Sequence, residues 1–136
     1  MTARTAPTRV ELGCAGHLIV STMCRFHRHT QIGDTYRVST VGDYYPNTRG
    51  TEVKRETIGA GPDAYFETMV FRTLPTQDEG NEGCGGHKVA DWSEIDGKRY
   101  ATAGEAQVGH EAMVAKYLRL DRTRAPRGAG KRRGTR

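Results

Sequence analysis

The sequence predicts an α+β domain, with an antiparallel sheet of about five strands and one C-terminal helix packed on one face. Two observations support this fold class. The 136 residues include 17 glycines and 5 prolines, and only 35% of them are hydrophobic. This composition favours short strands and many turns over long helices. Several segments also alternate apolar and polar residues, whereas a single segment near the C-terminus has helical periodicity.

The first predicted element is a β-hairpin unit within residues 17–46. Residues 17–23 are mostly apolar and β-branched, and residues 24–30 and 35–41 alternate. Residues 31–34, which include a glycine and an aspartate, have turn chemistry. We therefore expect two or three antiparallel strands here.

The best strand candidate is residues 65–72 (YFETMVFR). Both of its faces are largely apolar, which predicts a central strand covered on both sides. Residues 51–58 predict a weaker polar strand, and residues 89–95 a short one. The only tryptophan, Trp92, lies in this last segment, and we interpret it as a core anchor.

The one predicted helix begins at Thr102 and runs to about Leu120. Thr102 and Glu105 have the spacing of a capping box, and apolar residues then recur at intervals of three and four. This stripe is predicted to pack on the sheet, and it makes His110 a hydrogen-bonded core histidine rather than a ligand. The stripe comprises Ala106, His110, Met113, Tyr117 and Leu120, flanked by Val114 and Leu118.

Charge is distributed unevenly along the chain and predicts three regions. The formal net charge is +5, yet residues 10–120 hold 12 basic and 15 acidic side chains. We expect a flexible lead-in over residues 1–9, a single domain over residues 10–120 and a disordered basic tail over residues 121–136. The tail cations are expected to contact nucleic-acid phosphates without sequence preference. They are Arg122, Arg124, Arg127, Lys131, Arg132, Arg133 and Arg136.

The sequence gives no indication of a signal peptide or a membrane span. Residues 1–10 lack the apolar core of a signal peptide, and the apolar runs are too short to cross a bilayer. Three cysteines cannot all pair within one molecule, which favours a reducing compartment. We expect a soluble protein that is not secreted by a signal peptide.

Each cysteine is followed three residues later by a histidine, which is a zinc-ligand spacing. In Cys14/His17 and Cys84/His87 a glycine precedes the histidine, so that a tight knuckle can bring both side chains to one point. We predict a structural zinc site made of these four residues, with Cys24 as an alternative ligand. Four protein ligands leave no open position for a substrate. The alternative is that these thiols and imidazoles are unconnected.

His27 and His29 share one strand face because they lie two apart in an alternating run. They are either solvated surface histidines or, together with Glu67, the acid-base and metal-binding groups of an enzyme. Glu67 lies on an apolar face and is either paired with an arginine such as Arg37 or a catalytic acid. Because no P-loop, G-x-S-x-G or H-E-x-x-H motif occurs, enzymatic activity is disfavoured.

The segments CAGHLIV, CRFHRHTQIGDTYRVSTVGDYYP, YFETMVFRT, ADWSEID and TAGEAQVGHEAMVAKY resemble small uncharacterised proteins encoded by tailed double-stranded DNA bacteriophages. The resemblance covers residues 12–118 and excludes the basic tail. It implies a phage accessory or virion protein, located in the bacterial host cytoplasm or in the virion. It transfers no catalytic residue to this chain.

We therefore expect a small non-enzymatic binding protein. Its folded domain would engage a protein partner, and its basic tail would add non-specific nucleic-acid affinity. One alternative is a virion structural protein, such as a capsid or tail accessory protein, whose tail grips a neighbouring subunit or packaged DNA. The second alternative is a metal-dependent enzyme that uses His27, His29 and Glu67.

Overall fold

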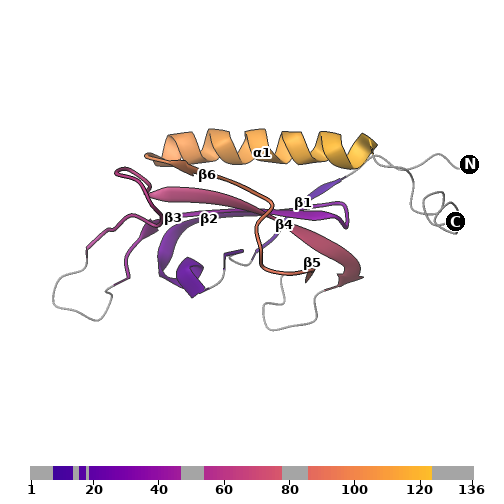
Figure 1. Ribbon diagram of the computed structural model, residues 1–136, viewed down its shortest axis with the longest axis horizontal. Coiled ribbons are helices and arrows are strands. Elements are labelled where there is room, and N and C mark those ends of the chain that lie inside the picture. The colour runs from indigo at the N-terminus through magenta and orange to yellow at the C-terminus, as the bar shows by residue number, and fades with distance from the viewer. Residues whose placement is uncertain (1–7, 14–15, 18, 47–53, 78–85, 124–136) are drawn as a thin grey trace, which may run out of the picture.

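The computed structural model contains a six-stranded antiparallel sheet with one long helix along one face (Figure 1). The structure describes residues 8–13, 16–17, 19–46, 54–77 and 86–123. The α+β class and the C-terminal helix are thus confirmed. The elements are β1 (Arg9–Glu11), the 3-10 helix η1 (Ile19–Met23), β2 (Cys24–Ile32), β3 (Tyr36–Tyr44), β4 (Phe66–Gln77), β5 (His87–Val89), β6 (Asp96–Tyr100) and α1 (Ala103–Thr123).

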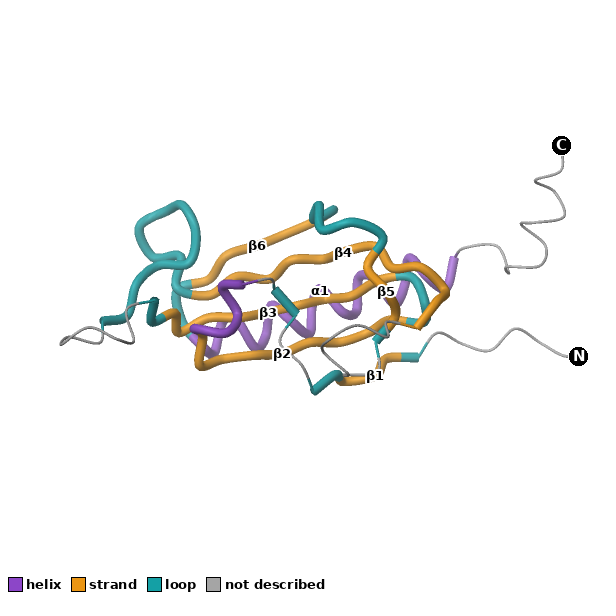
Figure 2. The backbone as a smooth tube through the Cα atoms, turned by 90° about the horizontal axis from the view of Figure 1, so that it is seen from below, coloured by secondary structure: helices purple, strands orange, loops and turns teal. Residues whose placement is uncertain are grey.

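The strand order is β1-β2-β3-β4, and both β5 and β6 pair with β4. The strand β6 pairs with the first part of β4 and β5 with its second part. Figure 2 shows β1 and β6 at opposite edges of the sheet, with α1 running behind it. Because β4 has neighbours on both sides, the prediction of a central strand over residues 65–72 is confirmed.

The predicted hairpin is formed by β2 and β3, with Ile32 opposite Tyr36 at its end. Gly33 in the turn has a φ of +52°, a conformation that glycine adopts without steric cost. The Thr35 N–H donates to the Ile32 carbonyl at 3.1 Å and closes the turn. The lead-in ends earlier than predicted, because β1 starts at Arg9 and pairs with β2.

The helix α1 begins at the predicted cap but ends later than predicted. The Glu105 N–H donates to Thr102 Oγ1 at 3.1 Å, and the Glu105 carboxylate accepts from the Ala101 N–H at 3.0 Å. The helix then continues to Thr123. Leu120 is exposed and Asp121 is buried, so the predicted stripe is wrong in its last turn. The reason is a hydrogen bond of 2.6 Å from the Thr35 hydroxyl to Asp121, which anchors the helix end to the hairpin turn.

Two apolar clusters lie between α1 and the sheet, one towards each end of the helix. The first contains Ile32, Val38, Val70, Met113, Val114 and Tyr117. The second contains Phe66, Tyr100 and Ala106, with Phe26 and Tyr65 packed against it. Their burial provides the hydrophobic contribution to folding on this side of the sheet.

Two weaker strand predictions differ from the structure. Residues 19–23 form the 3-10 helix η1 instead of a strand. In the predicted strand at residues 51–58, the described residues 54–58 make only an isolated bridge between Glu56 and Tyr44. The strand β4 pairs with β3 as far as Gly42, which leaves only the end of β3 free to pair with Glu56.

The segment between β4 and α1 also differs from the prediction. The sequence predicts a short strand over residues 89–95, whereas β6 begins at Asp96. Trp92 is 38% exposed and lies edge-on to Phe71 at a centroid distance of 5.0 Å, so the prediction of a core anchor is wrong. The strand β6 has no apolar alternation and is held in the sheet by its backbone pairing with β4.

Candidate functional site

A cluster of polar side chains is buried on the sheet face opposite α1. His17, which precedes η1, has its Nδ1 2.7 Å from the Ser39 hydroxyl in the middle of β3. Its Nε2 lies 3.5 Å from one carboxylate oxygen of Glu67 on β4. The other carboxylate oxygen lies 3.0 Å from the guanidinium of Arg99 on β6. His17, Ser39 and Glu67 are all buried, so the cluster is internal.

The cluster contains a hydroxyl, an imidazole and a carboxylate in the order found in the catalytic triads of nucleophilic hydrolases. A nucleophile must contact the reacting atom of its substrate. Ser39 is fully buried, and Gly16 lies so close above it that an added Cβ would collide with the hydroxyl. The arrangement therefore supports packing of residues 16–17 on the sheet rather than attack on a substrate.

The predicted ion pair of Glu67 with an arginine is confirmed, but its partner is Arg99 and not Arg37. Glu67 lies opposite Arg99 on β6 and opposite Val41 on β3. Arg37 lies further along β3, where it is fully buried against Gly86. The sequence could not indicate this choice, because the pairing of β6 with β4 brings together residues that are 32 positions apart.

His27 and His29 share a strand face as predicted, but their surroundings differ. His29 is buried next to Gly16, so the interpretation as a surface histidine is wrong for this residue. His27 is exposed, and its Nε2–H donates to the Ser21 carbonyl at 2.7 Å. Glu67 is occupied by His17 and Arg99. Within the part of the chain that the structure describes, no three metal-ligating side chains gather into one site.

Two of the four predicted zinc ligands, Cys14 and Cys84, lie outside the described residues. The other two, His17 and His87, are described. The His87 N–H donates to the Gln31 side chain at 3.0 Å, and its ring Nδ1 is buried without a hydrogen bond to any described residue.

The alternative ligand Cys24 is buried at the start of β2. Burial, together with Asp43 and Glu67, raises the pKa of its thiol to about 11. Zinc binds the thiolate form, so binding at Cys24 would release a proton from this thiol.

A directional chain of hydrogen bonds lies beneath α1. The Thr30 hydroxyl donates to Glu11 at 2.9 Å, so it accepts from His110 Nε2 at 2.8 Å. The His110 Nδ1 then accepts from the Thr40 hydroxyl at 2.6 Å. Thr40 in turn accepts from Thr68, and Thr68 accepts from Tyr100. From donor end to acceptor end the chain is Tyr100, Thr68, Thr40, His110, Thr30 and Glu11.

His110 is the centre of this chain, and the prediction of a hydrogen-bonded core histidine is confirmed. It is fully buried, and burial lowers its pKa to about 4, so the ring is neutral. A neutral ring that donates once and accepts once matches the chain's direction.

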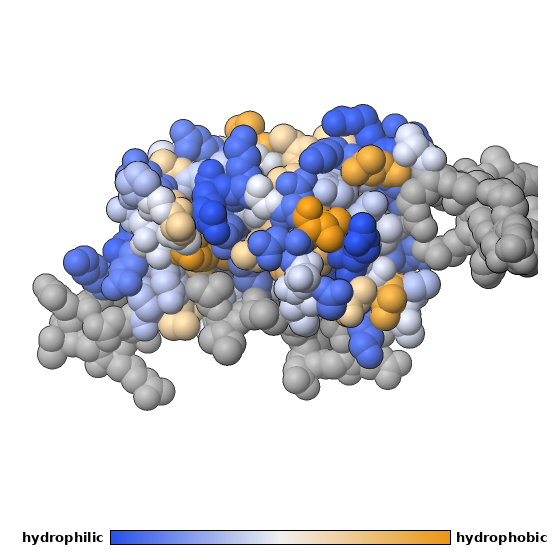
Figure 3. All heavy atoms as spheres, in the orientation of Figure 1, coloured by the Kyte–Doolittle hydropathy of each residue, from blue (hydrophilic) through white to orange (hydrophobic). Residues whose placement is uncertain are grey.

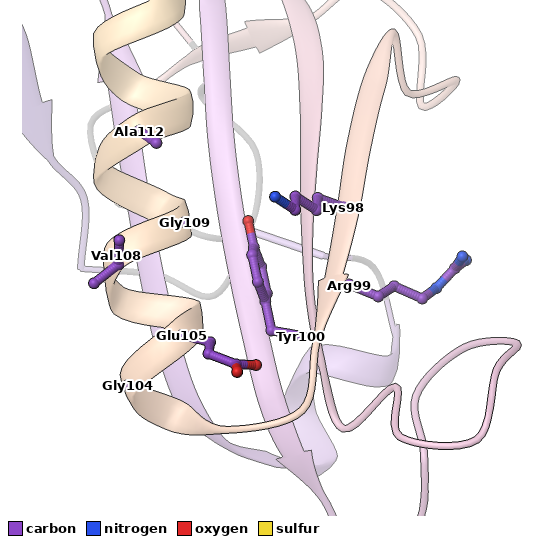
Figure 4. A pocket seen from close by; sticks show the side chains of 8 residues that line it. All are labelled: Lys98, Arg99, Tyr100, Gly104, Glu105, Val108, Gly109 and Ala112. Atoms are coloured by element: carbon purple, nitrogen blue, oxygen red, sulfur yellow. The ribbon is translucent and has the colours of Figure 1, made fainter.

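An open groove of about 510 Å³ lies between α1 and the edge strand β6 (Figure 4). The Tyr100 ring forms its floor and lies so close to Gly109 that an added Cβ would collide with the ring. Val108 and Ala112 line the helix side. Figure 4 shows the Lys98 side chain pointing into the space between strand and helix and Arg99 pointing away from it. Sequence reasoning missed this groove, although Gly109 beside an exposed valine was an available signal.

The C-terminal end of α1 is cationic. Arg119 and Arg122 are exposed and form no ion pair with any residue that the structure describes, whereas Lys116 is 2.7 Å from Asp96. Arg122 is the one predicted nucleic-acid contact within the described residues; the other six lie outside them. No helix in the described ranges is long and apolar enough to cross a membrane.

Neither the family models nor the curated proteins and solved structures compared with this chain match it. Function is therefore inferred from the chemistry of its own residues. The buried histidines and Glu67 are used in internal contacts, whereas the β6–α1 groove and the cationic end of α1 are open to a partner.

Proposed function

We propose that this protein is a small non-enzymatic phage accessory binding protein. Its cationic C-terminal end holds nucleic acid, and its folded domain engages a protein partner. The observation that supports this most is the clustering of cations at the C-terminal end of α1, where the exposed Arg119 and Arg122 directly precede six further Lys or Arg residues in the sequence.

Other arginines of the domain form ion pairs, as Arg28 does with Glu111 at 2.7 Å and Arg55 with Asp43 at 3.0 Å. The exposed Arg25 lies instead over the Tyr45 ring, and Arg72 is exposed on β4 without an ion pair to a described residue. Arg119 and Arg122 make no such pair within the described residues.

The helix fixes where these cations lie. Asp121, which lies between Arg119 and Arg122 in the sequence, anchors the last turn of α1 to the hairpin turn. The following residues 124–136 contain six Lys or Arg residues and no acid. Such a run of cations binds phosphates by releasing condensed counterions, and it gives affinity without reading sequence.

The test measures binding to a DNA duplex of about 24 base pairs by fluorescence anisotropy at several salt concentrations. Seven contacts from Arg122 and residues 124–136 would give a slope of log K against log salt no steeper than about −6. Truncation after Thr123 should remove most of the affinity and keep the fold, because it preserves the anchor at Asp121.

A full-length variant with the six cations of residues 124–136 changed to glutamine, the Gln-tail chain, is the length-matched control. It should behave like the truncated chain. Salt-insensitive binding, or undiminished binding by either variant, would contradict the proposal. A tail that binds no nucleic acid but is required for co-purification with phage particles would instead favour the virion alternative.

A structural zinc ion bound by Cys14, His17, Cys84 and His87 remains part of the proposal. Its support is the buried His87 Nδ1, which has no hydrogen bond within the described residues. His17 would ligate through Nε2, in competition with Glu67, because Nδ1 is bonded to Ser39.

Native mass spectrometry should show one zinc ion per chain, and both Cys14→Ser and Cys84→Ser should release it. The control is His27→Gln, which removes an exposed imidazole outside the set. A metal-free protein whose melting temperature does not change in EDTA would rule out this site.

The enzyme alternative is not favoured, because His27, His29 and Glu67 do not converge. Replacing His27 and His29 together by glutamine provides its test. Any turnover attributed to these residues should vanish in the double variant, and turnover that persists would exclude them.

A further inference from the structure

We propose that the β6–α1 groove binds an extended acidic segment of the protein partner, which adds to the sheet as a strand beside β6. This inference rests on the proposed binding function and specifies the chemistry of its partner. The nucleic-acid contact at the C-terminal end of α1 is a separate surface.

The strand β6 offers an open edge. It pairs with β4 on one side, and among the described residues no strand pairs with its other side (Figure 2). An open edge presents N–H and C=O groups that an extended peptide can pair with. The opposite edge strand, β1, has three residues against the five of β6 and so offers fewer such groups.

The groove lies where alternate side chains of an added strand would point. Successive side chains of a strand point to opposite faces, so every second one would be directed towards α1. An apolar side chain there would cover the Tyr100 ring and Val108, which is 72% exposed. The volume of about 510 Å³ is within the usual range of binding pockets.

Charge complementarity indicates an acidic occupant. The Lys98 ammonium lies 5.9 Å from the centroid of the Tyr100 ring and forms no ion pair with any described residue. Arg99 is directed to the other face, where it pairs with Glu67, and the Glu105 carboxylate caps the start of α1. An acidic side chain opposite Lys98 would therefore make a favourable cross-strand pair.

The same charge argues against two occupants from this chain. A second copy paired antiparallel about the centre of β6 would place Lys98 opposite Lys98, and like charges directly opposite are destabilising. The basic residues 124–136 are repelled in the same way. A flat apolar contact is also poorly supported, because the face in Figure 3 shows its apolar residues as separate spots among hydrophilic ones.

The experiment uses two labelled peptides of about ten residues with threonine at every second position, so that the other positions share one strand face. Those other positions alternate valine with glutamate in the acidic peptide and valine with lysine in the basic one. Binding is measured by anisotropy on the Gln-tail chain, so that the acidic probe cannot be held by the tail cations. We expect micromolar binding of the acidic peptide, about tenfold weaker binding of the basic one, and amide shifts in NMR spectra confined to β6 and the first half of α1.

Two variants locate the contact. Lys98→Glu should weaken the acidic peptide about tenfold and strengthen the basic one. Val108→Asp, at an exposed position, should weaken the acidic peptide without altering the fold. The matched control is Lys88→Glu, an exposed lysine on β5, which should leave both affinities unchanged. An acidic peptide N-methylated at alternate residues should not bind, because it lacks the strand's donors.

Several outcomes would overturn the inference. They are no binding of the acidic peptide up to about 1 mM, no change of preference in Lys98→Glu, amide shifts outside the groove, or undiminished binding of the N-methylated peptide. Duplex binding by the wild-type chain and its Lys98→Glu variant separates the two proposals. Duplex binding should be the same for both. Duplex binding by the wild-type chain without acidic-peptide binding by the Gln-tail chain contradicts the groove alone, and peptide binding without duplex binding contradicts the nucleic-acid site alone.

Discussion

The two faces of the sheet each bury a histidine, but the two rings have different neighbours. Under α1, His110 lies between the hydroxyls of Thr30 and Thr40 in a chain of neutral donors and acceptors. On the opposite face, His17 lies between the Ser39 hydroxyl and the Glu67 carboxylate, which in turn pairs with Arg99. The neighbours of His110 are thus neutral hydroxyls, whereas one neighbour of His17 is a carboxylate that is paired with an arginine.

The difference follows the element that covers each face. The helix α1 satisfies its own backbone over 21 residues and presents side chains at a fixed spacing, so a chain of hydroxyls can match it. The other face is covered in part by residues 16–17 and the short helix η1. Such a segment has little backbone pairing of its own, and the contacts of His17 with Ser39 and Glu67 help to hold it.

The largest effect is expected at His110. His110→Leu should lower the free energy of unfolding by about 3 kcal/mol, because it leaves the buried hydroxyls of Thr30 and Thr40 without their partner. His17→Leu should cost less, since Glu67 keeps Arg99. Urea unfolding of both variants measures the difference. Equal losses at the two positions would mean that the two faces are not satisfied differently.

The second effect is a loss of stability in mild acid. Burial holds the pKa of His110 at about 4, with Arg28 lowering it and Glu11 and Glu111 opposing. The unfolded histidine titrates near 6.5, so it takes up its proton before the folded one does. The contribution of neutral His110 to the free energy of unfolding, about 3 kcal/mol, is present above about pH 6.5 and is lost as the pH falls to about 4. His110→Leu should flatten the melting temperature in this window, and an unchanged slope would assign the loss to other groups.

A pair of glycines compares how rigid the two faces are. An added Cβ at Gly42 would overlap the buried Phe66 ring, and Gly42→Ala should cost about 1–3 kcal/mol. An added Cβ at Gly16 would meet the Ser39 hydroxyl and the His29 ring. Because residues 16–17 lie outside the strands and α1 and can move away, Gly16→Ala should cost less, about 1 kcal/mol. Thermal unfolding of the two variants checks the order, and a larger loss for Gly16→Ala would reverse the comparison.

The smallest effect is expected at Glu67. Glu67→Gln should cost only about 1 kcal/mol, because the Arg99 side chain is 46% exposed and can turn to water. Glu94→Gln, at an exposed position on the loop before β6, is the control and should have no measurable effect. A loss of several kcal/mol would show that the charge on this face does more than hold residues 16–17.

Local patterns in the sequence determined several elements of this fold. Alternation on both sides of Gly33 predicted the β2–β3 hairpin, and the two apolar faces of residues 65–72 predicted a central strand. The spacing of Thr102 and Glu105 predicted the start of α1, and the apolar stripe predicted that His110 is buried. These signals succeed because capping and amphipathic periodicity depend on residues that are close in the chain.

Only the tertiary structure decided which distant residues meet. Glu67 pairs with Arg99 and not Arg37 because β6 joins the edge of β4, and nothing in the composition of β6 indicates that pairing. Asp121 replaces Leu120 in the buried stripe because Thr35 lies within hydrogen-bonding distance of it. The β6–α1 groove also depends on tertiary structure, because the sequence of β6 does not indicate that this edge strand passes beside α1. Such contacts depend on long-range geometry, which a local pattern does not contain.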